Sequence, residues 1–192
     1  MTRLVLCRHG EAEDAAGRFC GSFDPALSST GLLQAEALAA VAGESVVYSS
    51  PARRALETAR AMRREPIVDP DLRELDFGEA EGLTYEDVAE RWPDLYEAWL
   101  RAPTEVCFPV GEPFANFRVR ILAALARIDR DAVVVTHGGV IRTALAHWLG
   151  MPDEAIFRID VSHGTVTVIE WQDGTPVVRL VNAPPASLAP GV

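Results

Sequence analysis

The chain contains 192 residues, of which 48% are hydrophobic and 24% charged, and its formal net charge is -10 at pH 7. Such a composition is typical of one soluble globular domain with a sizeable core. The negative charge disfavours nucleic acid as a partner, because nucleic acid requires a basic surface, although clustered arginines can still make one pocket positive enough for a small anion.

The cysteines indicate the compartment. Cys7, Cys20 and Cys107 are odd in number, and none belongs to a CxxC pair. This pattern disfavours a structural zinc site and a disulfide framework, and it favours a reducing environment. The first apolar run is too short for a secretion signal, and no apolar stretch is long enough to cross a bilayer. We therefore expect a cytoplasmic protein without a membrane partner.

Short apolar runs that end in polar or glycine-containing segments predict buried parallel strands. The runs of this kind are Leu4–Cys7, Val46–Tyr48 and Ala132–Val135. Each precedes a turn or loop, and the second leads into a helix in which a serine is the expected N-cap and Pro51 the expected first residue. Further helices are predicted at Thr30–Val41, Thr84–Arg91, Pro93–Arg101, Pro113–Ile128 and Val140–Leu149.

The last part of the chain predicts a β-hairpin. Thr165–Trp171 and Val177–Val181 flank Asp173-Gly174, a strong hairpin-turn signal. The fold expected from all these elements is a three-layer α/β/α sandwich with a mainly parallel central sheet and an antiparallel edge strand. We expect a single domain over residues 1–182, followed by a flexible tail rich in proline and alanine at 183–192.

Reactive side chains follow each of the three predicted parallel strands. Arg8 and His9 follow the first, the segment Ser49–Arg54 the second, and His137 the third. Ligands of such sheets bind beyond the carboxyl ends of the strands, so these side chains should meet at one rim. Two histidines and two arginines there predict a site for an anionic substrate.

Five motifs then occur in an order that resembles the histidine phosphatase superfamily, also called the phosphoglycerate mutase-like family. Together they span most of the chain from residue 4 to about 170. They are Arg8–Glu11, Leu27–Ala35, Ser49–Ala59, Leu72–Gly82 and Val135–Gly139. The resemblance implies the phosphoglycerate mutase-like fold and a catalytic mechanism that uses a phosphohistidine and neither a metal nor a cofactor.

The resemblance also implies the role of each residue. His9 would be the nucleophile, which must be neutral and oriented to attack phosphorus, and Glu74 would protonate the leaving group and then activate water from a partly dry pocket. Arg8, Arg54 and His137 would hold the phosphoryl oxygens. Three further residues are expected to contact the substrate, namely Arg18, Gly21 and Gly138.

Alternatives remain for several positions. Arg53 competes with Arg54 as the pocket arginine, and Asp76 and Glu79 compete with Glu74 as the acid. His137 could be a satisfied core histidine. His147 lies in a helical pattern and is expected to be structural or exposed, whereas His163 precedes a strand and could reach the rim of the pocket.

The sequence also departs from the family pattern. Where many members carry threonine and then asparagine in the phosphate pocket, this chain has Ala12 and, after it, the segment 13–16, which contains no asparagine. A lost asparagine would remove one phosphate contact without removing the nucleophile.

The function expected is hydrolysis of a small phosphorylated metabolite. The segment Pro109–Arg120 resembles one found in α-ribazole phosphatases and broad-specificity relatives, so α-ribazole phosphate is a candidate substrate. A cofactor-dependent phosphoglycerate mutase is the first alternative, disfavoured because the chain lacks room for the longer insertions of the mutases. An inactive phosphate-binding module is the second alternative. The sequence does not fix the oligomeric state, and a homodimer is compatible with it.

Overall fold

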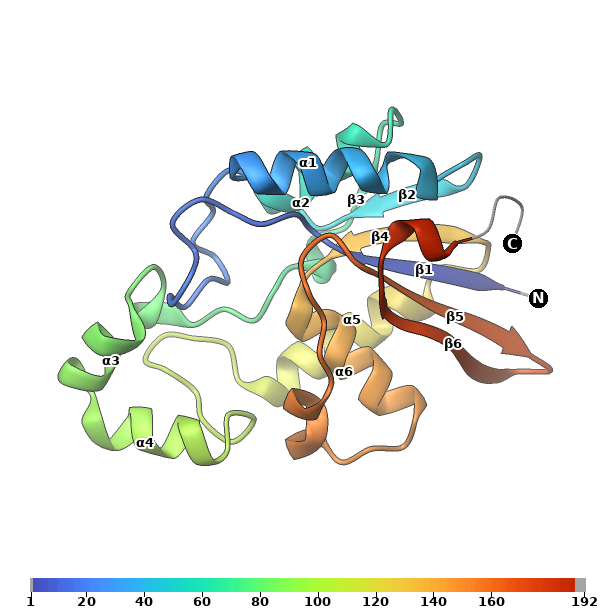
Figure 1. The fold of residues 1–192 in the computed structure, drawn as a ribbon. Helices are drawn as coiled ribbons and strands as arrows, with labels where there is room; N and C mark the ends of the chain where they lie inside the picture. The colour runs from blue at the N-terminus through green and yellow to red at the C-terminus, as the bar shows by residue number, and fades with distance from the viewer. Residues whose placement is uncertain (1, 189–192) are drawn as a thin grey trace.

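The computed structural model describes residues 2–188 and confirms the predicted α/β architecture. Its strands form one six-stranded sheet in the order β3-β2-β4-β1-β5-β6 (Figure 1). Their bounds are β1 Arg3–Arg8, β2 Val46–Ser49, β3 Ile67–Val68, β4 Ala132–Thr136, β5 Val166–Gln172 and β6 Thr175–Ala183. The first four strands pair in parallel, whereas β5 pairs antiparallel with β1 and with β6.

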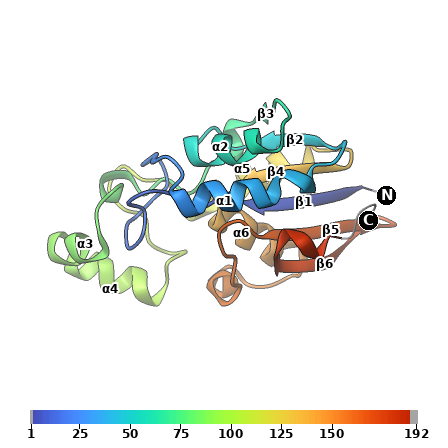
Figure 2. The same cartoon turned by 45° about the horizontal axis from the view of Figure 1, so that its top comes forward.

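Helices cover both faces of the sheet, with α1 and α2 on one side and α5 and α6 on the other (Figures 1 and 2). Their bounds are α1 Ser29–Leu38, α2 Arg53–Ala61, α3 Tyr85–Arg91, α4 Pro93–Arg101, α5 Phe114–Ala126 and α6 Gly138–Trp148. Short 3-10 segments lie at Ala39–Val41, Pro70–Leu72, Gly78–Ala80, Asp153–Arg158 and Pro185–Ser187.

The alternation of side chains along β1 shows how the two layers of core arise. Leu4 and Leu6 pack with residues of α5 and α6, while Val5 and Cys7 pack on the opposite face with residues of α1 and α2. Successive side chains of a strand point to opposite faces, and both faces here are buried, which is why the strand reads as a continuous apolar run.

The pair α3 and α4 lies away from the sheet, beyond the end of β1 (Figure 1). Its apolar side chains do not join the main core and instead surround Phe19, whose ring contacts Phe77, Tyr85, Trp99 and Phe108 edge to face. This separate aromatic cluster therefore anchors the two helices at the side of the molecule where the parallel strands end.

The hairpin and most helices lie where the sequence placed them, but the start of one helix was predicted wrongly and one strand was missed. The helix after β2 begins at Arg53 with Ala52 as its N-cap, so Pro51 precedes it; the Ser50 hydroxyl instead accepts a hydrogen bond from the Ala52 amide at 3.3 Å. The two-residue strand β3 was missed, because both of its side chains are exposed and give no apolar run of useful length.

The described part of the predicted tail lies against the domain. Ala183 is the last residue of β6, Pro185–Ser187 form a 3-10 turn, and Leu188 packs against the core cluster between the sheet, α1 and α2. Leu188 is the apolar residue that makes this contact in an otherwise proline- and alanine-rich segment. The rest of the predicted tail, 189–192, lies outside the described residues.

Candidate active site

A cavity of about 530 Å³ opens where β1, β2 and β4 end, on the side that carries α3 and α4. Arg8, His9, Arg54 and Glu74 line its floor and wall, so residues from distant motifs meet as the sequence predicted. Aromatic residues of the Phe19 cluster, including Tyr85 and Trp99, form part of the opposite wall. The cavity thus has a cationic end and an aromatic end.

His9 is buried and held in a single orientation. Its Nδ1 lies 2.7 Å from the carbonyl oxygen of Gly10, to which it donates, so Nε2 carries the lone pair. Burial, and then the charges of Arg54 and Arg8, lower the pKa of His9 well below its usual value. The imidazole is therefore neutral at neutral pH, and the lone pair of Nε2 is its nucleophilic site.

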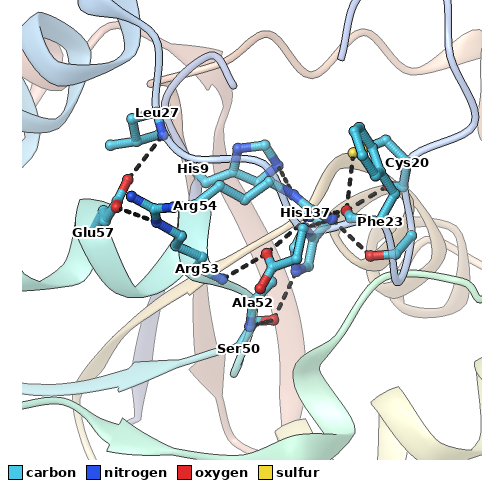
Figure 3. Close-up of polar contacts among 12 residues, drawn as sticks. His9, Cys20, Phe23, Leu27, Ser50, Ala52, Arg53, Arg54, Glu57 and His137 are labelled. Carbon is cyan, nitrogen blue, oxygen red and sulfur yellow. Dashed lines mark hydrogen bonds and ion pairs between the residues drawn. The ribbon is translucent and has the colours of Figure 1, made fainter. Parts of the chain in front are cut away.

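Arg54 is the pocket arginine, and it is almost completely buried. Its Nε donates to His9 Nε2 at 3.3 Å, and its Nη groups donate to the carbonyls of Phe23 and Gly21 at 2.9 and 3.0 Å (Figure 3). Asp24 lies 3.5 Å from Nη1. The competing Arg53 is exposed and bonds Glu57 at 2.7 Å on the helix surface, which settles the choice between the two arginines.

His137 lies one layer deeper than the cavity wall. Its ring centroid is 5.0 Å from that of His9, and its Nδ1 lies 3.3 Å from Arg54 Nη2. Its Nε2 lies 2.7 Å from the Ser50 hydroxyl (Figure 3). Burial, and then the neighbouring arginine, hold the pKa of His137 well below its usual value. His137 is thus both a satisfied core histidine and a direct neighbour of the pocket arginine.

Arg8 is fixed by the loop before β5. One Nη group donates to the carbonyl of Val161 and the other lies 2.8 Å from His163 Nε2. Burial, and then repulsion from Arg142, lower the pKa of Arg8 to about 10, so it remains charged at neutral pH. His163, which the sequence left undecided, lines the cavity with its ring centroid 5.3 Å from that of His9.

Of the three carboxylates considered for the acid, Glu74 is the one that lines the cavity. Its Oε2 accepts the Gly139 amide at the start of α6 at 2.9 Å, and its backbone carbonyl accepts Arg120 Nη2 at 2.9 Å. The two competitors lie elsewhere: Asp76 caps the Gly78 amide, and Glu79 pairs with Arg91. A carboxylate beside the neutral imidazole can donate or accept a proton at the atom that leaves phosphorus.

Of the three further residues expected at the substrate, Arg18 lines the cavity and the two glycines do not. Gly21 does not line the cavity. Its amide donates to Glu81 and its carbonyl accepts a hydrogen bond from Arg54, so Gly21 helps to hold the Arg54 side chain. Gly138 is also absent from the lining and lies behind the guanidinium groups of Arg8 and Arg142. Arg18 lines the cavity, but its Nη1 donates to the carbonyl of Gly82 at 2.6 Å.

The loop that lacks the usual asparagine presents small side chains. Ala12, Ala15 and Ala16 line this part of the wall, and Ala12 also forms a β-bridge with Leu27. No amide side chain of this loop therefore faces the cavity.

Two contributors were missed by the sequence reasoning. Ser50 was considered only as a cap, because its contact with His137 joins residues 87 positions apart. Arg142 lies in the predicted helix after His137, one turn beyond the glycines, and it lines the cavity. Arg142 follows Gly139 by three residues and Gly138 by four, so it lies on their face of the helix, and this spacing could have been read from the sequence.

The described residues also bear on metal sites and membrane-spanning helices. Within residues 2–188, no group of three or more His, Cys, Asp or Glu side chains is arranged to hold a metal ion. No helix in the same range is long and apolar enough to cross a membrane.

The chain belongs to the histidine phosphatase superfamily (branch 1), whose sequence model matches residues 4–184. The bifunctional protein Rv2228c of Mycobacterium tuberculosis is 36% identical over 196 residues, covering 94% of this chain. The match covers 54% of that relative, so this chain spans about half its length.

Two further similarities concern named phosphatases. A metal-independent phosphoserine phosphatase of Arabidopsis thaliana is 37% identical over 158 residues, which cover 74% of this chain and 66% of that protein. The crystal structure of the α-ribazole phosphatase of Shigella flexneri matches with a TM-score of 0.85 at 27% identity, covering 95% of this chain and 96% of that one.

Proposed function

We propose that this chain is a metal-independent phosphomonoesterase that hydrolyses a small phosphorylated metabolite through a phosphohistidine on His9. The observation that carries the proposal is the state of His9. Its imidazole is neutral, its Nδ1 is fixed by the Gly10 carbonyl, and its Nε2 lies beside the buried Arg54 guanidinium. Such a nucleophile needs no separate activating base.

The reaction would proceed in two balanced steps. His9 Nε2 attacks phosphorus, the ester P–O bond breaks, and Glu74 gives its proton to the leaving alcohol. Glu74, now ionised, takes a proton from water, which attacks the phosphohistidine and releases inorganic phosphate. Arg8, Arg54 and His137 would stabilise the charge on the phosphoryl oxygens throughout. Arg54 lines the cavity beside His9 Nε2, whereas His137 lies behind it and would reach the phosphoryl oxygens only by giving up its contact with Arg54 or with Ser50.

The cavity supports the choice of a small phosphoester over a macromolecule, because about 530 Å³ fits a metabolite. The names of the relatives suggest two candidate substrates, phosphoserine and α-ribazole phosphate. Metal independence is supported by the name of the plant relative. A phosphoglycerate mutase and an inactive phosphate-binding module remain the alternatives that an experiment must separate.

The decisive experiment measures hydrolysis of p-nitrophenyl phosphate with and without EDTA. We expect equal rates in both, and a loss of roughly 1000-fold or more in His9→Ala. His147→Ala, which changes an exposed histidine, is the matched control and should retain activity. Activity that disappears with EDTA would refute metal independence, and an active His9→Ala variant would refute the nucleophile.

The alternatives have their own readouts. Interconversion of 2- and 3-phosphoglycerate faster than phosphate release would favour the mutase. Binding of inorganic phosphate without turnover of any phosphoester would favour the binding module. A metabolite panel that contains phosphoserine and α-ribazole phosphate would then rank the substrates.

A further inference from the structure

Arg142 lines the cavity but has no part in the two proposed reaction steps. It is in the second turn of α6, half-buried, and its Nε donates to the carbonyl of Ile159 at 2.8 Å. This bond fixes the plane of the guanidinium and leaves both Nη groups without a protein hydrogen bond in the described part of the chain. An oriented fork that lines a cavity can bind an anion.

The charge of Arg142 is not balanced by a carboxylate. Among residues 2–188 it forms no ion pair, and neither does Arg8. The acidic residue next to its anchor, Asp160, is exposed and accepts instead from Asn182 at 2.8 Å. The formal net charge of the protein is -10. An arginine without an acidic partner therefore makes this part of the cavity locally positive within an acidic protein.

Arg142 also lies close to a second cation, the guanidinium of Arg8. A Cβ at Gly138 would lie 2.9 Å from Arg142 Nη1 and 3.4 Å from Arg8 Cζ, so the two guanidinium groups stand side by side over that glycine. Repulsion from Arg142 is the largest Coulombic cause that lowers the pKa of Arg8. Two adjacent like charges are stabilised when an anionic ligand binds them both.

One phosphoryl group does not use all of these donors. His9 and Arg54 define where phosphorus must lie, and Arg8 is close enough for its charge to lower the pKa of His9. Arg142 lies on the other side of Arg8, next to apolar wall residues that include Ile156 and Phe157. It is therefore placed for a second group of the same small substrate.

We propose that Arg142 binds a carboxylate of the substrate, so that the preferred substrates are phosphomonoesters that also carry a carboxylate. This inference rests on the proposed phosphatase function and narrows its substrate class. The two Nη groups of one guanidinium match the two oxygens of a carboxylate, whereas a second phosphate would need more donors than this partly apolar wall offers. Phosphoserine has such a group beside its phosphate.

The test compares two ligands that differ only by the carboxylate, O-phosphoserine and O-phosphoethanolamine. We expect kcat/KM to favour O-phosphoserine by roughly 10- to 100-fold in the unchanged protein. Arg142→Met should bring the ratio close to one, and Arg142→Lys should restore part of it, because an ammonium keeps the charge without the fork. Arg158→Met, which removes an exposed charge from outside the cavity lining, should leave the ratio unchanged.

A binding measurement separates this inference from the proposed function. In His9→Ala, calorimetry should give the same ratio of Kd values for the two ligands, and Arg142→Met in that background should abolish it. A protein that shows the binding ratio but no turnover contradicts only the phosphatase mechanism. Two results would overturn the carboxylate site. One is turnover or binding without preference for O-phosphoserine, and the other is an equal loss for both ligands in Arg142→Met.

Discussion

Glu74 is the residue whose chemistry changes between the two proposed steps. Its Oε2 accepts the Gly139 amide, and Leu75 donates its own amide to Oε1 at 3.1 Å. A Cβ at Gly139 would lie 2.2 Å from Glu74 Oε1, so only glycine allows the carboxylate to sit against the start of α6. The backbone thus positions the acid without engaging any catalytic side chain.

Glu74→Gln should separate substrates by their leaving groups. An alkyl phosphate needs a proton for its leaving oxygen, so we expect kcat/KM to fall by roughly 100-fold or more. p-Nitrophenol is a good leaving group, so its kcat/KM should fall far less, and rapid mixing should show a burst of p-nitrophenolate before slow turnover. Glu79→Gln, at an exposed ion pair, is the control. Equal losses for both substrates would contradict the acid role.

The residues most easily predicted are those fixed by local register. The pattern around Arg54 distinguished it from Arg53, and the structure agrees because only Arg54 turns toward the sheet. Ser50 could not be predicted as a partner of His137, because that contact depends on how β2 and β4 pair. Gly21 was assigned to the substrate because its support of Arg54 depends on the path of a loop.

At the scale of elements, the N-terminus of α1 is joined to the loop that carries His9. Ser28 caps the helix by accepting the Gly31 amide, its hydroxyl donates to Glu11 at 2.7 Å, and Glu11 donates its amide to Gln34. A Cβ at Gly31 would lie 1.9 Å from the carbonyl oxygen of Glu11. The helix can approach the catalytic loop this closely only because residue 31 has no side chain.

Gly31→Ala should therefore displace the loop. The clash involves backbone on both sides, so we expect a loss of about 1–3 kcal/mol of stability together with lower activity. Thermal unfolding and p-nitrophenyl phosphate hydrolysis measure the two effects. Glu36→Ala changes an exposed position of the same helix and should alter neither. An unchanged Gly31→Ala protein would show that α1 does not constrain the loop.

The strands and most helices were predictable because each carries its own pattern. The buried strands read as apolar runs, and the hairpin turn follows from Asp173 and Gly174, which both have positive φ. The start of α2 was predicted too early, because Ser50 and Pro51 offer a local cap signal that the contact of Ser50 with His137 overrides. Local chemistry predicts an element well except where tertiary contacts use the same atoms.

At the scale of the whole molecule, burial of His9 and His137 couples the site to stability. The pKa of each is held well below its usual value. Below about pH 6.5 the unfolded chain binds protons on these side chains and the folded chain does not, so stability is complete above that pH and falls as the pH decreases. Between about pH 7.5 and 5.5 the two histidines should cost about 3 kcal/mol.

Urea unfolding at several pH values measures this effect. His9→Asn should remove roughly a third of the pH dependence, because His163, whose pKa burial lowers to about 4, contributes alongside His9 and His137. His147→Asn, at an exposed position, should leave the pH dependence in place. Stability that stays constant between about pH 7.5 and 5.5 would mean that the two histidines are not neutral in the folded protein.

The class of fold was predictable, but the arrangement of its parts was not. Alternating elements imply a mainly parallel sheet with two helical layers, and both are present. Nothing local in the sequence specifies that β1 lies between β4 and β5, which brings the rings of His137 and His163 next to that of His9.

The central claim is that His9 carries the phosphoryl group, and trapping that intermediate tests it most directly. Glu74→Gln should slow its hydrolysis, so rapid quenching after addition of p-nitrophenyl phosphate, followed by mass spectrometry at neutral pH or above, should find one phosphoryl group per chain. We predict that it lies on the peptide containing His9 and that it is absent when His9→Ala is added. A phosphoryl group on another residue, or full turnover with no phosphorylated protein, would contradict the account.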